Sequence, residues 1–405
     1  MKQKGITILD NGLRLFYCRV PAKVIHAKLR LNVGSMTEPS DKRGLAHIVE
    51  HVGFNGTKTY PTSTSLESAA ADIALELNAS TSFRSIDYPF DTLCRDFSAA
   101  ASIIADIAFA PSITPKALEK EKEIVLHEYR MYHDSLKFHK SALFNRVFFH
   151  GTPAETMVLG TKQNIGSITV SDVQKYHVDH CTPANSDLFV FGGLDDQILQ
   201  EIKMVFDNYP SGKKALPVTF SLAPLKANEH VEQVMPALQQ TYGTIVYRAP
   251  LLTDPELPAL NYLNEILAGR GTSSLYKRIR EELQLAYAVS PYLFSDVHTG
   301  YFGIDFNSLP ERAHECRNLV IDLVRNMNPD EREIAWVRKN LEKNFAESSD
   351  KMRIRFENFF NEKLYGFKQA AYERAILSVT KKNILDVRDK YLQGLYQSMM
   401  LVPSL

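Results

Sequence analysis

Two histidines and a glutamate lie within one short stretch of the chain, GLAHIVEHVGF, at residues 44–54. His47 and His51 are four residues apart, so on a helix both rings project from one face, and Glu50 lies on that face three residues after His47. The opposite side of this helix is apolar and carries Leu45, Ile48, Val49 and Val52. These groups are typical of zinc sites, but the pattern also suits an ordinary polar helix face, and a catalytic zinc needs a third protein ligand.

The best candidates for a third ligand are two glutamates within EKEKEIVLHEYRMY, residues 119–132. Glu121 and Glu128 are seven residues apart, hence on one face of a helix and about 10.5 Å from each other, at the edge of an apolar stripe. A carboxylate at that edge costs free energy to bury unless it meets a cation, a metal ion or good hydrogen-bond donors. The alternative is that both belong to an ordinary charged helix surface.

The composition indicates a soluble globular protein of two or three domains, with 405 residues of which 44% are hydrophobic and 23% charged. Its 47 basic and 47 acidic side chains balance, so nothing favours binding to nucleic acid or to an anionic membrane. The four cysteines are widely spaced, so we expect neither disulfides nor a cysteine zinc site. No stretch has the pattern of a signal peptide or a membrane-spanning helix, and we expect a cytoplasmic protein.

The first half mixes strand and helix patterns. Asp10-Asn11-Gly12 predicts a tight turn between two strands within residues 6–20, and alternation over 26–34 predicts a third strand. The remaining predicted elements are helices at 44–54, 65–77, 97–108, 114–135 and 173–180, and strands at 79–83, 87–92 and 187–193.

The second half repeats this order. It predicts a strand pair within 232–247, helices at 255–267 and 274–283, strands at 286–293 and 301–307, long helices beyond 329 and a closing strand at 398–402. Residues 210–231 are rich in Pro, Lys and Ser and predict a linker. The sequence therefore predicts an α+β fold of two homologous halves, 1–209 and 232–405, each a mostly antiparallel sheet with helices packed on one face.

The H-x-x-E-H pattern at residues 47–51, with a glutamate seventy-seven positions after its second histidine, resembles the inverted-zincin peptidases of the pitrilysin family. That family includes insulin-degrading enzyme, mitochondrial processing peptidase and small bacterial relatives. Its usual surroundings match over most of the chain, at Gly34-Ser35, Glu38, Gly44-Leu45-Ala46, Phe54, Gly56-Thr57, Asn78-Ala79, Thr81, Leu159-Gly160-Thr161, Ile168-Thr169, Pro183 and Asn185. The resemblance implies the metalloenzyme fold of the LuxS and pitrilysin type.

The resemblance also implies roles for individual residues. His47, His51 and Glu128 would hold one zinc ion per chain, with Glu50 as the general base and Glu121 as a supporting carboxylate. The implied activity is that of a zinc metalloendopeptidase.

Substrate binding is implied for both halves. In the family, extended peptides add a strand to an exposed sheet edge, here near Asn78, Ala79 and Ser80. Arg280 and Tyr287 of the second half would grip the substrate, and Tyr287 would also stabilise the developing oxyanion. The alternatives are a packing role in a strand for Tyr287 and an ordinary helix-surface position for Arg280. Two departures from the family pattern are the sparse glycines at 269–274 and the large residues at 75–77.

Two homologous halves are only part of the four-domain chamber found in larger relatives, so we expect a homodimer, or else a heterodimer with a related subunit. The competing function is that of a non-catalytic subunit of the same fold, like family members that have lost their metal. The intact set of His47, Glu50, His51 and Glu128 favours the enzyme.

Overall fold

The computed structural model describes residues 3–215, 222–223, 228–268, 273 and 275–404. It divides into two compact units, one of Met1–Phe138 and Phe149–Leu222 and the other of His139–Phe148 and Ala223–Leu405. The chain thus passes between the units inside the segment predicted as a linker, and the short segment His139–Phe148 belongs with the second unit although it lies early in the sequence.

The first unit is built on a six-stranded sheet in the order β1-β2-β6-β3-β5-β4. Its strands are β1 (Lys4–Ile8), β2 (Arg14–Arg19), β3 (Val24–Leu31), β4 (Ser80–Thr81), β5 (Ile86–Leu93) and β6 (Ser186–Gly192). All neighbours run antiparallel except β2 and β6, which are parallel.

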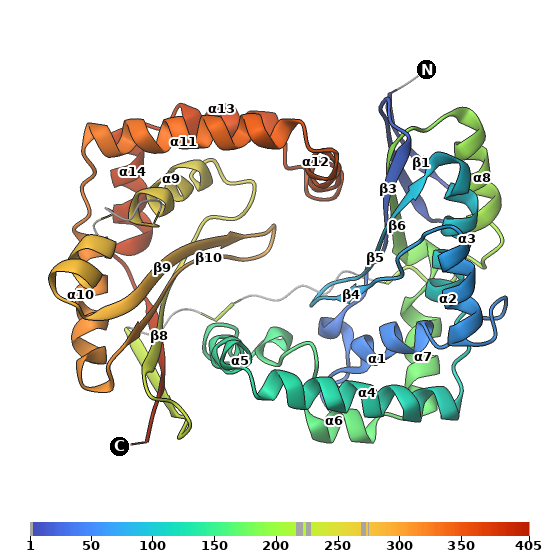
Figure 1. Ribbon diagram of the computed structural model, residues 1–405, viewed down its shortest axis with the longest axis horizontal. Coiled ribbons are helices and arrows are strands. Elements are labelled where there is room, and N and C mark those ends of the chain that lie inside the picture. Colours follow the sequence, from blue (N-terminus) through green and yellow to red (C-terminus); the bar gives the residue numbers. More distant parts are fainter. Residues whose placement is uncertain (1–2, 216–221, 224–227, 269–272, 274, 405) are drawn as a thin grey trace. The chain divides into compact units, whose positions relative to one another are not determined.

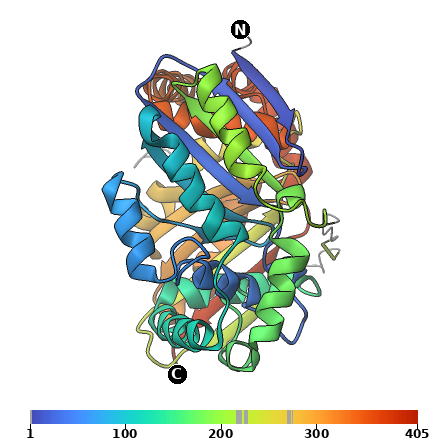
Figure 2. The ribbon, with the colours of Figure 1, turned by 90° about the vertical axis from the view of Figure 1, so that its right-hand side faces the viewer.

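Helices cover one face of this sheet and one of its ends. They are α1 (Leu45–Gly53), α2 (Ser63–Asp72), α3 (Phe97–Phe109), α4 (Pro115–His133), α6 (Lys162–Ser167), α7 (Val170–His180) and α8 (Asp196–Phe206). Figure 2 shows α3 and α8 side by side over the strands, where α3 contacts β3 and β5. In Figure 1, α1 lies at the lower end of the sheet, where it packs against α4 and α7.

The second unit is built on a five-stranded sheet in the order β7-β11-β8-β10-β9. Its strands are β7 (Glu229–Val234), β8 (Thr241–Arg248), β9 (Ala286–Ser295), β10 (Gly300–Ser308) and β11 (Gln397–Val402). Its helices are α9 (Leu257–Ala268), α10 (Ala313–Arg325), α11 (Glu331–Ser349), α12 (Met352–Tyr365), α13 (Gln369–Leu377), α14 (Lys381–Val387) and π-helical turns at Tyr276–Glu282 and Arg388–Leu392.

The two sheets share one topology, which confirms the prediction of two related α+β halves. In each, the last strand inserts between a parallel and an antiparallel neighbour, so that β2-β6-β3-β5-β4 corresponds to β7-β11-β8-β10-β9. Each unit has its own hydrophobic core beneath the helices. In the part of the chain that the structure describes, no helix is both long and apolar enough to span a membrane.

Both faces of the second sheet are covered. Phe302, Ile304 and Phe306 of β10 enter the core under α9 and α10. On the other face, Phe144 and Phe148 of α5 (Leu136–Phe148) contact Tyr301, and Lys140 pairs with Asp305 at 2.5 Å. The sequence predicted helices on one face of each sheet, whereas in the second unit α5 also covers the other face. α5 was not predicted because its apolar residues follow no single stripe.

Three further details differ from the sequence predictions. The helix predicted at 65–77 ends at Asp72, and Leu75 instead enters the core with 5% of its surface exposed. The strands predicted as a pair within 232–247 are not neighbours, because β11 lies between β7 and β8. The helix α10 was also missed. Strand pairing between distant segments is decided by tertiary contacts, which local patterns do not record.

The start of α1 depends on the glycine at position 44. Gly44 has a φ of 96°, in the left-handed region, and a Cβ atom there would lie 2.6 Å from the carbonyl oxygen of Leu159. An L side chain is strained in this conformation, and the backbone of Leu159 cannot move away cheaply. The entry into the helix that carries His47 and His51 is therefore fixed by a residue without a side chain.

We expect Gly44→Ala to lower the free energy of unfolding of the first unit by about 1–3 kcal/mol, because it adds both backbone strain and a steric clash. Urea unfolding followed by circular dichroism measures this. The matched control is Gly166→Ala in α6, where a Cβ atom would meet nothing within 4 Å, and which should leave stability unchanged or slightly higher. Equal stability of the two variants would contradict the role of Gly44.

Candidate metal centre

The helix α1 buries the predicted apolar stripe and turns its two histidines toward α4. Leu45, Ile48, Val49 and Val52 are at most 4% exposed, whereas both histidines are only half-buried. The packing of α1 against α4 brings residues 47–51 and 121–128 together. Local helix periodicity sets the orientation of the histidines, and the helix crossing supplies the third side chain.

Three ligand-type atoms converge between the two helices. The Nε2 atoms of His47 and His51 are 3.3 Å apart, and Glu128 Oε2 lies 3.8 Å from the first and 3.6 Å from the second. Glu128 Oε2 and His47 Nδ1 are buried without a hydrogen-bond partner. Such a set of atoms could hold a metal ion.

Glu121 holds the ring of His51 from its other side. Its Oε2 atom lies 3.0 Å from His51 Nδ1, and its Oε1 atom accepts a 2.5 Å hydrogen bond from the amide of Asn55. With Nδ1–H donating to Glu121, the Nε2 lone pair of His51 is directed toward Glu128. Asn55 was missed in the sequence, although it lies one turn after His51 on the same side of the chain.

The charges of this cluster are strongly coupled. Burial, together with the nearby His51, lowers the pKa of His47 to about 3, so this imidazole is neutral at pH 7. Burial also opposes protonation of His51, but the hydrogen bond to Glu121 and the charges of Glu128 and Glu50 outweigh it and raise the pKa of His51. Burial would raise the pKa of Glu121, yet hydrogen bonds from His51 and Asn55 lower it on balance. Glu121 is thus an ionised carboxylate that holds the ring of His51 in place.

Glu50 is a buried carboxylate of the centre, with 8% of its surface exposed. Burial is the main reason why the pKa of Glu50 is raised, and the charge of Glu128 acts in the same direction. The hydroxyl of Thr81, on the edge strand β4, donates a hydrogen bond to Glu50 Oε2. A carboxylate with a raised pKa is a stronger base than an exposed glutamate, which suits a group that transfers protons.

The predicted substrate-binding segment lies at the free edge of the first sheet. Ser80 pairs with Asp87 and Thr81 with Ile86, and β4 has no neighbour on its other side among the described strands. Asn78 and Ser80 are exposed, while Ala79 packs against the core. The edge therefore has room for a further strand beside Glu50.

Arg280 and Tyr287 lie together in the second unit. The guanidinium carbon of Arg280 is 5.0 Å from the centre of the Tyr287 ring and 4.9 Å from that of Tyr276. Tyr287 is 71% exposed on β9, the edge strand that corresponds to β4 of the first unit. Of the glycine-poor segment 269–274, only Ser273 lies within the described residues.

The helix that corresponds to α1 in the second unit carries no metal ligands of this kind. α9, LPALNYLNEILA, follows β8 as α1 follows β3, but it has no histidine. It buries Leu260, Tyr262 and Leu263 completely. The fold is duplicated, and the centre is not.

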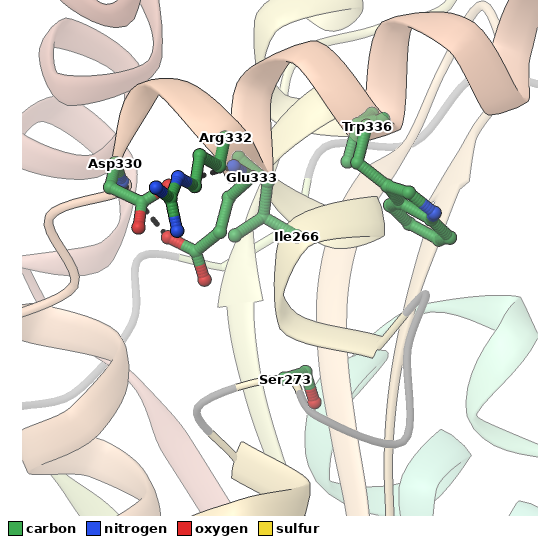
Figure 3. A pocket seen from close by; sticks show the side chains of 7 residues that line it. Ile266, Ser273, Asp330, Arg332, Glu333 and Trp336 are labelled. Carbon is green, nitrogen blue, oxygen red and sulfur yellow. Dashed lines mark hydrogen bonds between the residues drawn. The ribbon is translucent and has the colours of Figure 1, made fainter.

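The second unit also contains a pocket of about 320 Å³ beside α11, shown in Figure 3. Its two carboxylates already have structural partners, because Asp330 accepts a hydrogen bond from the backbone N–H of Glu333, and Glu333 from that of Asp330. This is a capping box at the start of α11. None of the predicted site residues lines this pocket.

Comparison with known proteins agrees with this geometry. Residues 19–162 match the family description "Insulinase (Peptidase family M16)", and residues 167–341 match "Peptidase M16 inactive domain". The protein is therefore a two-domain metallopeptidase-type chain, with the candidate metal centre in its first domain. It belongs to peptidase family M16, the pitrilysin and insulinase family.

Individual relatives cover most of the chain. An "Uncharacterized zinc protease" of Rickettsia bellii is 27% identical over 84% of this chain and 83% of its own length. "Uncharacterized zinc protease YmxG" of Bacillus subtilis is 25% identical over 78% of both chains. Among solved structures, a protease from Helicobacter pylori superposes with a TM-score of 0.89 over 99% of both chains at 18% identity, which shows the shared fold.

The position of α1 is also fixed by a buried carboxylate. Glu38 Oε1 and Oε2 accept hydrogen bonds from the backbone N–H groups of Ala46 and Gly44, at 2.7 and 3.0 Å. Burial outweighs these bonds and raises the pKa of Glu38 from 4.5 to about 7. The folded protein thus binds the proton of Glu38 more tightly than the unfolded chain does. Protonation of Glu38 therefore contributes fully to the free energy of unfolding below pH 4.5, and this contribution is lost as the pH rises through 7.

We expect Glu38→Gln to abolish this pH dependence. Between pH 5 and pH 8 the wild type should lose on the order of 3 kcal/mol of unfolding free energy relative to the variant. Urea titrations of both proteins at pH 5, 6, 7 and 8 measure the difference, and all other titrating groups cancel. Parallel curves for the two proteins would show that Glu38 keeps its ordinary pKa.

Proposed function

We propose that this protein is a zinc metalloendopeptidase that hydrolyses peptide bonds of extended peptides or unfolded segments. The observation that carries the proposal is the convergence of His47, His51 and Glu128, with three ligand atoms within 3.3–3.8 Å, beside the buried Glu50. The names of the relatives, which call them zinc proteases, support the choice of metal.

The side chains present fit a zinc ion. Donor atoms placed tetrahedrally at the usual zinc distances are about 3.3–3.4 Å from each other, close to the separations between the three atoms here. The buried Oε2 atom of Glu128 lacks a hydrogen-bond donor, and a cation would satisfy it. One ion per chain would be held by His47, His51 and Glu128, with Glu121 orienting His51.

A zinc ion in such a site is a Lewis acid that polarises the substrate carbonyl and makes a water molecule acidic near pH 7. Glu50 would take the proton from the attacking water on Oε1 or Oε2 and deliver it to the nitrogen of the leaving amine. Thr81 holds Glu50 in place through its hydroxyl, so the carboxylate and the edge strand β4 are linked. Tyr287 would stabilise the developing oxyanion through a hydrogen bond from its hydroxyl group.

The free edge at β4 supports the proposed substrate class. A peptide added as a further strand beside Ser80 and Thr81 would be read mainly through its backbone, so side-chain specificity would be loose. Only an extended segment can present its backbone in this way, which excludes folded substrates. Asn78, Ala79, Ser80 and Arg280 would contribute to holding the peptide.

We further propose that the protein works as a homodimer whose two chains together enclose a chamber. The duplicated topology supplies two related domains per chain, so a pair of chains supplies four. Because the candidate metal ligands and the pair of Arg280 and Tyr287 are all present in one chain, a second copy is a sufficient partner.

We expect Glu50→Gln to bind zinc as the wild type does and to lose roughly 10²–10⁴-fold in kcat/KM, because proton transfer is lost while the metal ligands stay. Zinc content and cleavage of a fluorogenic peptide are measured on the same samples. The control is Glu123→Gln on the exposed side of α4, which should match the wild type in both measurements. Undiminished activity of Glu50→Gln would refute the role of Glu50, and inactivity of wild type that holds zinc would favour a non-catalytic subunit.

For the dimer, we expect light scattering to give about twice the chain mass of 45.8 kDa. Specific activity should fall on dilution as the dimer dissociates, and an excess of the inactive Glu50→Gln chain should restore it by re-forming mixed dimers. Serum albumin added instead controls for adsorption. A fully active monomer at high dilution would overturn the chamber.

A further inference from the structure

A second group of metal-ligating side chains lies in the second unit. Among the described residues, two groups of three bring one ligand atom each within 4.8 Å of the others, namely the candidate zinc centre and the set of His230, Glu232 and His314. Glu232 Oε1 lies 2.9 Å from His230 Nε2 and 3.2 Å from His314 Nε2. The two imidazole rings are 5.7 Å apart and nearly perpendicular.

The three side chains come from two elements that the fold brings together. His230 and Glu232 are two residues apart on β7, so both point to the same face of the sheet. β7 is one of the two edge strands of that sheet, and β11 is its one neighbour among the described strands. His314 is the second residue of α10, which packs on β8 and β10.

The ring of His230 is already oriented. Its Nδ1 atom is hydrogen-bonded to the hydroxyl of Ser398 at 2.9 Å, and Ser398 lies opposite His230 on β11 and is only 1% exposed. In this structure His230 Nε2–H donates to Glu232 Oε1 at 2.9 Å, and a bound cation would replace that proton, with Nδ1–H then donating to the hydroxyl of Ser398. A hydrogen bond of this kind fixes the tautomer of metal-binding histidines.

We propose that His230, Glu232 and His314 bind a second divalent transition-metal ion, with Zn²⁺ as the physiological class, and that this ion ties the edge strand β7 to α10. Two imidazoles and one carboxylate select such ions over Mg²⁺ and Ca²⁺, which prefer oxygen ligands. The side chains of His314 and Glu232 are 60% and 38% exposed, so the ion reaches the site from solvent and keeps water in its remaining positions. The site is independent of the proposed peptidase activity.

The ion would protect a weak part of the sheet. β7 follows the linker and, among the described strands, pairs with β11 alone, so its hydrogen bonds open more easily than those of the inner strands. A cation bound by both β7 and α10 stabilises only the closed arrangement, because the ligands are far apart in an opened strand. Zinc should therefore slow amide exchange over Glu229–Val234.

The test is a titration of the full-length protein with Zn²⁺ after removal of bound metal. We expect two equivalents per chain for the wild type and one for His314→Ala, with Glu232→Gln also losing the weaker equivalent. Ser398→Ala should weaken that equivalent roughly 10–100-fold, because His230 loses its orienting partner. His298→Ala, at another exposed histidine of the same unit, is the matched control and should still bind two.

Hydrogen exchange provides a second measurement that does not depend on activity. Zinc in slight excess over two equivalents should slow exchange of β7 in the wild type and in His298→Ala, but not in His314→Ala. The proposal is overturned if His314→Ala binds as much zinc as the wild type, or if His298→Ala loses an equivalent equally, which would indicate non-specific binding to surface histidines. Because His47→Ala should lose only the tighter equivalent, failure at one site is distinguishable from failure at the other.

Discussion

The structure of the candidate centre depends on one imidazole ring held from two sides. Glu121 accepts the Nδ1 proton of His51, and the Nε2 atom on the opposite edge faces Glu128 across 3.6 Å. Both glutamates come from α4 and are two helical turns apart. This separation leaves room for one histidine ring between the two carboxylates. The separation of residues 121 and 128 is thereby explained by the size of the group between them.

The electrostatics of this arrangement favour a cation. Glu50, Glu121 and Glu128 are three carboxylates within one half-buried cluster, and one of the two imidazoles, His47, is kept neutral. Burying carboxylates without compensating positive charge costs several kcal/mol per group. Burial raises the pKa of Glu50, and the hydrogen bond to Glu121 with the nearby carboxylates raises the pKa of His51 against the effect of burial. The cluster therefore suits a bound cation.

The duplicated fold shows which parts of the scaffold are general. Both units insert their last strand between a parallel and an antiparallel neighbour, and both place a helix after the corresponding strand, α1 in one and α9 in the other. α9 fills its position with apolar residues and packs as core, whereas α1 replaces one side of the same helix with histidines and glutamate. The candidate metal centre is thus formed by a few side chains on a scaffold that the second unit repeats without them.

The sequence by itself determined the periodic features: the apolar stripe of α1, the shared face of His47, Glu50 and His51, and the two α+β halves. Helix and strand periodicities depend on residues close together in the chain, so the sequence alone reveals them. Only the tertiary structure decided the crossing of α1 and α4, the hydrogen bonds from Asn55 and Thr81, the insertion of β11 beside β7, and the grouping of His314 with His230 and Glu232. These contacts join residues 31 to 168 positions apart or lie between separate elements, and packing of whole elements sets them rather than any local pattern.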